Sequence, residues 1–426
     1  MRGTILCRGF VAVAALACLT GYVYAYAFGR AGVPIRSDAF SYYVYLPAWL
    51  LYHDPSLQSV ADDCCGGTFP AWTAITRWPR THRWIDAHPI GEAILIAPFF
   101  ALAHLLTKWT NLTPDGFTLY YQHAAGLAGL CYVIVGLWFL RRLLMRYFAD
   151  AVVVGALATL LLGTSLYHYA TFDSVWSHAF SFALCSALLE RLDAWEPGAW
   201  RSEAAIGVLS GLLILVRHTN VVIPVCLLAT AWRPGAFPGS AASRRRLTLT
   251  AALVAALVVL PQLWLYRRAT THWLVSSYGT LGFTFGSPHI AGVLIGPQKG
   301  LFFYAPVLLL AVAGLAVLPP RLQRWRLAIF TILGVHTYLI ASWWDWQFGG
   351  SYGHRGFVDV YPFFAAGLAS AFARLMPHRR ISAAIGTAVG LLCALSLFQM
   401  LQYWHGVLPM SDVTWSQYRG VFLRTW

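Results

Sequence analysis

Long runs of apolar residues alternate with short polar segments along the whole chain. A helix needs about 20 apolar residues to cross the hydrocarbon core of a bilayer, and eleven segments have this character. They lie at about residues 9–28, 118–140, 149–168, 175–192, 203–216, 218–232, 248–266, 301–318, 327–343, 357–374 and 382–403. The pattern predicts an all-α, polytopic membrane protein in which residues 1–426 form one domain with about eleven transmembrane helices.

A further apolar run, Ala93 to Leu106, has only 14 residues, which is short for a span and typical of a re-entrant or interfacial helix. It lies within the longest stretch between predicted spans, residues 29–117. The aromatic-rich segment 37–47 of that stretch also reads as an interfacial helix. Long connections with helices of their own are usually functional, so we expect residues 29–117 to form a long, functional first outer loop on the periplasmic side.

Composition and charge agree with a membrane protein. Only 11% of the 426 residues are charged, against roughly a quarter in soluble proteins, which excludes a soluble multidomain protein. The formal charge of +14 comes from 28 arginines and two lysines that cluster mostly between apolar runs. Eleven crossings place 17 basic and 5 acidic residues on one side and 13 basic and 11 acidic residues on the other. By the positive-inside rule the first side is cytoplasmic, which favours a multi-pass inner-membrane protein with no nucleic-acid partner.

The N-terminus and the cysteines give weaker signals. The first apolar run resembles a signal peptide that ends near Ala27, but it is long enough to remain as an anchor. The adjacent Cys64 and Cys65 lack the spacing of a zinc site, and their state is left open. Six other cysteines lie in or beside apolar runs and are expected to be packing residues: Cys7, Cys18, Cys131, Cys185, Cys226 and Cys393.

Two acids lie at expected outer membrane boundaries. Asp38 follows the first span and precedes Tyr42 by one helical turn; a carboxylate among aromatic rings can act as a general base toward a hydroxyl. Its alternative role is to cap the helix that starts there. Asp173 and His178 lie where an outer loop enters the next span, and ionisable groups at such depth tend to be functional. Alternatively, Asp173 is the N-cap of that span and His178 makes a hydrogen bond between helices.

Cations near the same face are candidate phosphate ligands, because a phosphate leaving group needs positive charge and directed donors. Arg217 interrupts two apolar spans, and Lys299 follows Gly296-Pro297-Gln298. The alternative for each is snorkelling of a long side chain.

The densest signal is the outer segment 343–359, which mixes tryptophans, glycines and the charged residues Asp345, Arg355 and Asp359. Glycines let the backbone approach a ligand, and aromatic rings cover sugars. An aromatic belt explains the tryptophans alone. His88 and Glu92 flank the start of the short apolar run and complete the candidate set, with capping and turn formation as their alternative. No zinc-protease, nucleophile-elbow or nucleotide-binding motif occurs in a suitable context.

At these residues the chain resembles the membrane glycosyltransferases of the C superfamily, which include protein O-mannosyltransferases and aminoarabinose transferases and take sugars from polyprenyl phosphate carriers. The resemblance spans most of the chain. Its motifs are Asp38 before Tyr-Tyr-x-Tyr-Leu-Pro, His88-Pro89-Ile90-Gly91, Asp173 to Ser177-His178, Leu215-Val216-Arg217, Lys299-Gly300-Leu301-Phe302 and Trp346 to Arg355. It implies that Asp38 is the base and that the other outer-face acids and cations bind the donor phosphate or the acceptor. The sequence identifies no cofactor with certainty and leaves open whether a divalent metal assists.

These observations predict a glycosyltransferase that moves a sugar from a polyprenyl-phosphate carrier to a hydroxyl of a glycan, lipid or protein acceptor at the periplasmic face. One alternative is a flippase or transporter for a lipid-linked sugar. Transporters tend to hold charge near the midplane between repeated halves, whereas these charges crowd one face and no repeat is evident. A non-catalytic scaffold for envelope assembly is the other alternative, and it would leave the outer-face acids dispersed.

Overall fold

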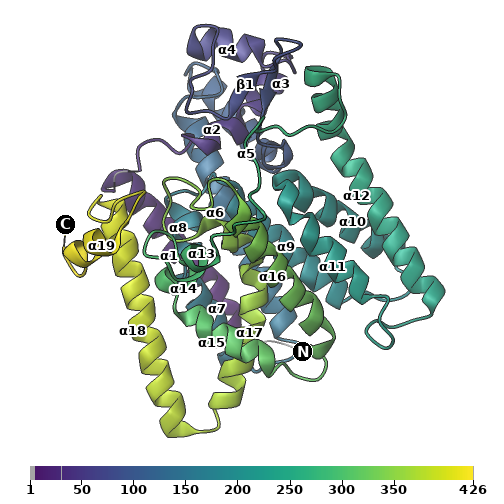
Figure 1. Ribbon diagram of the computed structural model, residues 1–426, viewed down its shortest axis with the longest axis vertical. Helices are drawn as coiled ribbons and strands as arrows, with labels where there is room; N and C mark the ends of the chain where they lie inside the picture. Colours follow the sequence, from purple (N-terminus) through teal and green to yellow (C-terminus); the bar gives the residue numbers. More distant parts are fainter. Residues whose placement is uncertain (1–4, 30, 426) are drawn as a thin grey trace.

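The computed structural model describes residues 5–29 and 31–425, and most of them are helical (Figure 1). Helices at all eleven expected positions form a bundle. They are α1 (Ile5–Ala27), α6 (Leu119–Leu144), α7 (Asp150–Leu162), α9 (Ser177–Asp193), α10 (Trp200–Val216), α11 (Val222–Thr230), α12 (Ala241–Thr270), α15 (Val307–Ala316), α16 (Arg326–Ser342), α17 (Tyr361–Leu375) and α18 (Arg379–Trp404).

The remaining elements are short and lie mostly between these helices. They are α2 (Asp38–Tyr43), α3 (Tyr45–Leu50), α4 (Gln58–Cys65), β1 (Ile75–Arg77), β2 (Trp84–Asp86), α5 (Gly91–Trp109), α8 (Leu166–Thr171), η1 (His218–Val221), α13 (Ile290–Ile295), α14 (Leu301–Tyr304), η2 (Gln323–Trp325), η3 (Arg355–Val360) and α19 (Trp415–Val421). The antiparallel pair β1–β2, with Thr76 opposite Ile85, is a small departure from the expected all-α fold.

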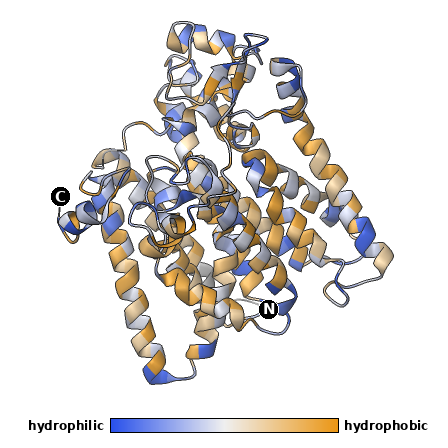
Figure 2. Cartoon of the chain, in the orientation of Figure 1, coloured by the Kyte–Doolittle hydropathy of each residue, from blue (hydrophilic) through white to orange (hydrophobic). Residues whose placement is uncertain are grey.

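Seven helices of the described residues are long and apolar enough to cross a membrane, namely α1, α5, α6, α12, α18 and the helices that continue from η2 into α16 and from η3 into α17. Figure 2 shows that hydrophobic residues dominate the long bundle helices, while hydrophilic residues gather at their two ends. In lipid a helix satisfies its own backbone hydrogen bonds. The expectation of an all-α, multi-pass membrane protein is therefore confirmed.

Small residues let the bundle helices approach closely. A Cβ atom added to Gly314 of α15 would lie 1.9 Å from the carbonyl oxygen of Gly367 in α17. Similarly, a Cβ atom on Gly207 of α10 would lie 2.6 Å from the Cβ atom of Val254 in α12. Such contacts are typical of membrane helices, which gain more from close packing than from hydrophobic burial.

The basic clusters meet at one end of the bundle, which we call the basic end. Arg146 Nη1 lies 2.8 Å from Asp193 Oδ2, and Arg324 forms an ion pair with the same carboxylate. Arg246 Nη2 lies 2.9 Å from Glu203 Oε1. In Figure 1 the α17–α18 turn and the loop before α12 lie at the lower side. Arg2 of the first cluster is outside the described residues.

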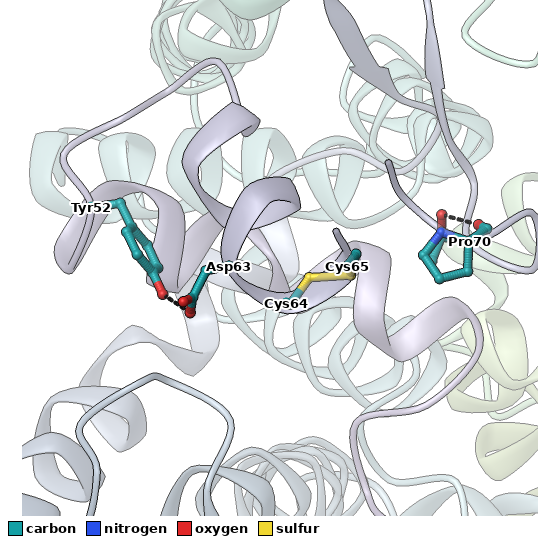
Figure 3. The surroundings of a disulfide bond; sticks show 6 residues. Tyr52, Asp63, Cys64, Cys65 and Pro70 are labelled. Atoms are coloured by element: carbon teal, nitrogen blue, oxygen red, sulfur yellow. Dashed lines mark hydrogen bonds between the residues drawn. A yellow bond between two sulfur atoms is a disulfide. The ribbon is translucent and has the colours of Figure 1, made fainter. Parts of the chain in front are cut away.

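The opposite end, which we call the loop end, holds α2 to α5 and the β1–β2 pair (Figure 1). Cys64 and Cys65 form a disulfide with each other there, close to the hydrogen bond from Tyr52 to Asp63 (Figure 3). Cys18 and Cys185 are buried free thiols, as expected of packing residues. Cys131 is exposed on α6, so the packing prediction is wrong for it. The side chain of Cys7 is outside the described part of the chain.

Helix α5 differs in length from the expected short helix. It has 19 residues rather than 14, because the helix continues into polar residues at both ends, and it is long enough to cross a membrane. It runs antiparallel to α6, because the Tyr132 hydroxyl donates to Leu95 O at 3.2 Å and the Tyr121 hydroxyl lies 2.6 Å from His104 Nδ1. The N–H of Ile90 donates to Gln262 Oε1 of α12. Beyond the last turn of α5, Gly116 O accepts from Tyr43 of α2, so the chain that leaves α5 lies at the loop end. The expectation of a re-entrant or interfacial helix stays a prediction.

Candidate active site

A cavity of about 510 Å³ opens at the loop end, and seven of the ten predicted site residues line it. They are Asp38 and Tyr42 from α2, His88 from the β2–α5 turn, His178 from α9, Arg217 from the end of α10, and Asp345 and Arg355 from the segment that follows α16. We call it the site cavity. Helix ends from distant parts of the sequence meet here because the bundle helices alternate in direction.

Asp38 and Arg355 form the central ion pair of the site cavity. Arg355 Nη1 donates to Asp38 Oδ2 at 2.7 Å, although the two residues are 317 positions apart. Ser37 occupies the N-cap position of α2 with a φ of 49°, and its side chain makes no capping hydrogen bond. The Asp38 carboxylate therefore faces a cation rather than serving only as a helix cap.

The Arg355 guanidinium also lies over two aromatic rings. Its central carbon is 4.3 Å from the ring centroid of Trp176 and 5.5 Å from that of Phe348. The guanidinium of Arg217 lies 5.4 Å from the same Phe348 ring. Two arginines thus share one aromatic ring, whose electron-rich face partly offsets the cost of holding like charges together.

Arg217 is held by a buried carboxylate and an imidazole. Arg217 Nε lies 3.1 Å from Asp359 Oδ2, and Arg217 Nη1 donates to His178 Nε2 at 3.2 Å. His178 Nδ1 donates in turn to Asp359 Oδ1 at 3.0 Å. This arrangement requires a neutral imidazole with its proton on Nδ1. His178 is therefore an interhelical hydrogen-bonder, as one alternative held, and it also lines the site cavity.

Each of the two site arginines is paired with a carboxylate. Burial raises the pKa of Asp38, but the Arg355 guanidinium and, to a smaller extent, His88 lower it by more. The net result is a pKa of about 2. Asp38 is therefore ionised at neutral pH and neutralises one arginine, while Asp359 neutralises the other. A phosphate group that replaces one carboxylate partner would find two guanidinium groups already oriented, which is the geometry that arginine uses for phosphate.

Tyr42, His88 and Asp345 are the other predicted residues that line the site cavity. The Tyr42 ring packs against the His88 imidazole with centroids 4.3 Å apart. Asp345 Oδ1 accepts a hydrogen bond of 3.3 Å from the N–H of Gly349. Asp345 thus fixes the turn that carries Phe348 and also presents a carboxylate to the cavity.

Asp173 lies outside the site cavity, in a buried network. Arg36 Nη2 donates to Asp173 Oδ1 at 2.5 Å, and His168 Nε2 donates to Asp173 Oδ2 at 2.8 Å. Trp404 Nε1 of α18 donates to His168 Nδ1 at 2.9 Å. Asp173 is not the N-cap of α9, which is Trp176. The network instead ties the segment before α2 to α8 and α18.

Lys299 also lies outside the site cavity and is almost fully buried. Its ammonium group donates to the carbonyl oxygens of Ser351 and Met410, at 2.7 Å for Met410. These bonds tie the segment before α14 to the 343–359 loop and to the chain after α18. Because Lys299 is buried, its side chain does not extend to the membrane surface as the snorkelling alternative required. Its two hydrogen bonds favour a role in holding these loops in place over contact with a phosphate.

Replacing Lys299 with methionine is expected to lower the free energy of unfolding by about 2 kcal/mol, because two buried carbonyl groups lose their donor. Thermal unfolding of the purified chain measures this change. Lys108→Met is the matched control, since Lys108 is the other lysine and is exposed at the end of α5. A Lys299 variant with unchanged melting temperature and a raised KM for a donor lipid would restore the phosphate-binding prediction.

Glu92, the last predicted residue, is fully buried in the first turn of α5 and does not line the site cavity. Neither carboxylate oxygen has a hydrogen-bond partner among the described residues. The N-cap of α5 is Ile90 and makes no side-chain cap, so Glu92 does not form the expected capping arrangement. Its predicted role in substrate binding stays a prediction.

Asp359, which the sequence analysis included among the charged residues of segment 343–359, holds Arg217 and His178. Three residues that the sequence analysis did not place in the site also take part in it: Trp176 covers Arg355, and His336 and Tyr278 line the cavity. His336 and Tyr278 had no comparable signal, because only the packing of α16 and of the segment after α12 brings them to the cavity.

The described residues do not suit a tightly bound metal ion. No group of three or more histidine, cysteine, aspartate or glutamate side chains with suitable geometry exists within residues 5–29 and 31–425. The acid nearest the chemistry, Asp38, faces a guanidinium rather than a second carboxylate. We therefore derive no step through a metal.

No protein-family model matches the chain, and no curated protein matches it. Solved structures do. ArnT from Cupriavidus metallidurans bound to undecaprenyl phosphate aligns with a TM-score of 0.55 and 15% identity over 91% of this chain, and the apo ArnT gives 0.54. The oligosaccharyltransferase of Archaeoglobus fulgidus, in complex with Zn and sulfate, aligns with a TM-score of 0.50 and 11% identity over 98% of this chain and 57% of its own. The chain therefore shares the fold of ArnT and of this oligosaccharyltransferase over most of its length.

The likeness is one of fold. The chain spans 63% of the length of the ArnT structures that it matches. The predicted site residues lie at the ends of several helices. These helix ends meet at the loop end of the bundle, where the site cavity lies.

Proposed function

We propose that the protein is a glycosyltransferase that moves a sugar from a polyprenyl-phosphate carrier to an acceptor hydroxyl at the periplasmic face of the inner membrane. The observation that carries the proposal is the Asp38–Arg355 pair beside Arg217 within one cavity. It supplies a carboxylate for the acceptor and two cations for the departing phosphate in the same space. The fold and the bound undecaprenyl phosphate of ArnT support this assignment.

The reaction is a direct displacement at the anomeric carbon of the sugar. The acceptor oxygen forms a bond to that carbon while the bond to the carrier phosphate breaks, and the phosphate keeps the electron pair. Arg355 and Arg217 stabilise the negative charge that develops on the phosphate. Asp38 takes the acceptor proton.

The ion pair with Arg355 regulates the basicity of Asp38. While the pair is intact, the carboxylate has a pKa of about 2 and binds protons weakly. A donor phosphate that engages Arg355 draws the guanidinium away and brings a like charge close to the carboxylate. Both effects raise the pKa of Asp38, so donor binding itself activates the base.

Part of the wall of the site cavity is apolar and suits the lipid carrier. Apolar side chains from the segment after α12 and from α16 line it: Leu281, Phe283, Leu339, Ile340 and Trp343. Leu281 and Phe283 remain substantially exposed. An isoprenoid tail leaving the phosphate along this wall would continue into the hydrocarbon core between helices, whereas a polar acceptor would approach from the loop end.

The test is a transfer assay with the full chain in lipid vesicles. Undecaprenyl-phosphate sugars, with the sugar radiolabelled, are supplied as a panel of hexoses and pentoses together with a membrane extract as acceptor. We expect the label to leave the carrier for one sugar of the panel and free undecaprenyl phosphate to appear in equal amount. Label that stays on the carrier but crosses the bilayer would favour a flippase. Label that neither moves nor crosses would favour a scaffold.

A further inference from the structure

We propose that Trp72 is the platform of a subsite for a sugar ring of the acceptor, so that the acceptor hydroxyl belongs to a glycan rather than to a peptide side chain or a lipid alcohol. This inference rests on the proposed function and deepens it, because it names the class of molecule that Asp38 deprotonates. The observation that carries it is an exposed indole ring that lines the site cavity and is attached to the helix of the base.

Trp72 lines the site cavity with much of its side chain uncovered. It is 57% exposed, although tryptophan is among the residues that gain most from burial. A tryptophan in an interfacial aromatic belt is exposed because it faces lipid headgroups, whereas Trp72 forms part of the wall of a cavity. Ligand sites are lined by aromatic side chains of this kind together with a few polar groups. The open indole is therefore a surface that a bound ligand would cover.

Hydrogen bonds hold the turn that carries Trp72. The N–H and the hydroxyl of Thr73 both donate to Pro70 O, at 2.9 Å and 2.8 Å respectively. The next N–H, that of Ala74, donates to Ser41 Oγ at 3.1 Å. The backbone on both sides of the indole is thus fixed before a ligand arrives. A preformed surface lowers the entropic cost of binding.

The same turn is attached to α2, the helix that begins with Asp38. Ser41, which accepts the N–H of Ala74, lies three residues after Asp38. The Phe40 ring packs against the Trp72 ring with centroids 5.6 Å apart and an angle of 75° between the planes. Such an edge-on contact covers at most one face of the indole. Because the acceptor hydroxyl must reach the Asp38 carboxylate, a ring attached to α2 is placed for the acceptor.

A second half-exposed tryptophan of the site cavity is attached to a different element. Trp344 lines the cavity and is 48% exposed, and its N–H donates to Gly282 O at 3.0 Å. Gly282 lies between Leu281 and Phe283, which belong to the apolar wall that suits the carrier. Trp344 is therefore associated with the carrier, and Trp72 with the base.

A sugar ring matches the chemistry around Trp72. The C–H groups on one side of a sugar ring pack against an aromatic face, which carries partial negative charge, while the hydroxyl groups at its edge need hydrogen bonds. The imidazole of His218 and the hydroxyl of Thr219 line the same cavity and can pair with them. An acyl chain would cover the indole but leave these polar groups without partners. An extended peptide is recognised chiefly through its backbone at a sheet edge or in a groove.

The first experiment measures how Trp72→Ala uses the acceptor in the vesicle transfer assay. The amount of membrane extract that gives half the maximal rate should rise about tenfold, which corresponds to about 1.4 kcal/mol. The maximal rate and the KM for the undecaprenyl-phosphate sugar should stay within about twofold, because Asp38 and the arginines are unchanged. Trp72→Phe should recover most of the loss, since it keeps an aromatic face.

Trp109→Ala is the matched control. Trp109 is 82% exposed at the end of α5 and does not line the site cavity, so its removal should leave the use of the extract unchanged. Thermal unfolding of each variant shows whether the fold is intact. An equal requirement for extract in folded Trp72→Ala and in the unmodified chain would overturn the subsite, and so would a rise confined to the donor KM.

The second experiment identifies the group that receives the label. Partial acid hydrolysis of the labelled product should release a labelled disaccharide, in which the transferred sugar is joined to a sugar of the acceptor. Solvent extraction and protease digestion of the intact product then distinguish a glycolipid, a glycoprotein and a polysaccharide as the source of that sugar. Label joined directly to a serine, a threonine or a lipid alcohol would overturn the sugar subsite.

These outcomes separate the subsite from the function on which it rests. Transfer by the unmodified chain to an amino-acid side chain or a lipid alcohol would leave the proposed function standing and remove the subsite. Absence of transfer by the unmodified chain across the sugar panel would overturn the proposed function and the subsite with it.

Discussion

Replacing Asp38 with asparagine is expected to reduce kcat for sugar transfer by about 10³-fold, because the acceptor hydroxyl loses its base. The donor KM should stay the same or fall. Asparagine keeps the size of the side chain but no longer neutralises Arg355, so the guanidinium becomes fully available to the donor phosphate. Steady-state kinetics with the labelled donor measure both parameters.

The control for this variant is Asp62→Asn, which removes an exposed carboxylate on α4, also at the loop end, that does not line the site cavity. It should transfer sugar at the unmodified rate. Full transfer by Asp38→Asn would remove the base from the proposal. A raised donor KM with unchanged kcat would instead assign Asp38 to donor binding.

Replacing Arg355 with glutamine should lower kcat/KM by about 100-fold, with a large rise in the donor KM. A charge-assisted contact to phosphate that is removed from a buried site costs about 2–5 kcal/mol, and each 1.4 kcal/mol corresponds to a factor of ten. Arg355→Lys should recover only part of this loss, because lysine keeps the charge but not the planar group that lies over Trp176 and Phe348.

Arg379→Gln is the matched control, because Arg379 is exposed at the basic end and does not line the site cavity. Its kinetics should match those of the unmodified chain. Binding of undecaprenyl phosphate alone, measured in detergent, separates the two contributions: Arg355→Gln should weaken it and Asp38→Asn should not. Equal binding by both variants would contradict the assignment of Arg355 to the phosphate.

The sequence located the helices well because hydropathy is a local property. Each of the eleven expected segments, such as 118–140 and 382–403, overlaps a helix, although α7 ends at Leu162 rather than at 168 and α12 begins at Ala241 rather than at 248. Helix α5 is also longer than its apolar run, because the helix continues into Gly91, Glu92 and the polar residues up to Trp109. Apolar content marks the lipid-facing part of a helix and not the backbone hydrogen bonds that extend it.

The sequence predicted some site residues correctly and others not. Residues with similar sequence patterns meet different partners in the folded protein. Arg217 and Lys299 both interrupt apolar surroundings near the loop end. Arg217 reaches the site cavity because α10 ends there, whereas Lys299 is enclosed by two carbonyl groups of neighbouring loops. Asp38 and Asp173 both border spans, yet one faces Arg355 and the other is bound by Arg36 and His168.

The sequence by itself determined that this protein is a multi-pass helical membrane protein, that its basic clusters share one end, and that its candidate chemistry lies at the other. These properties follow from the bilayer. Each spanning segment needs enough apolar residues to cross it, and the loops between spans carry more basic residues on one side than on the other. Only the tertiary structure decided that Asp38 meets Arg355 across 317 residues and that Asp359 orients Arg217. Such pairings depend on how helices pack and cross, and no single segment contains that information.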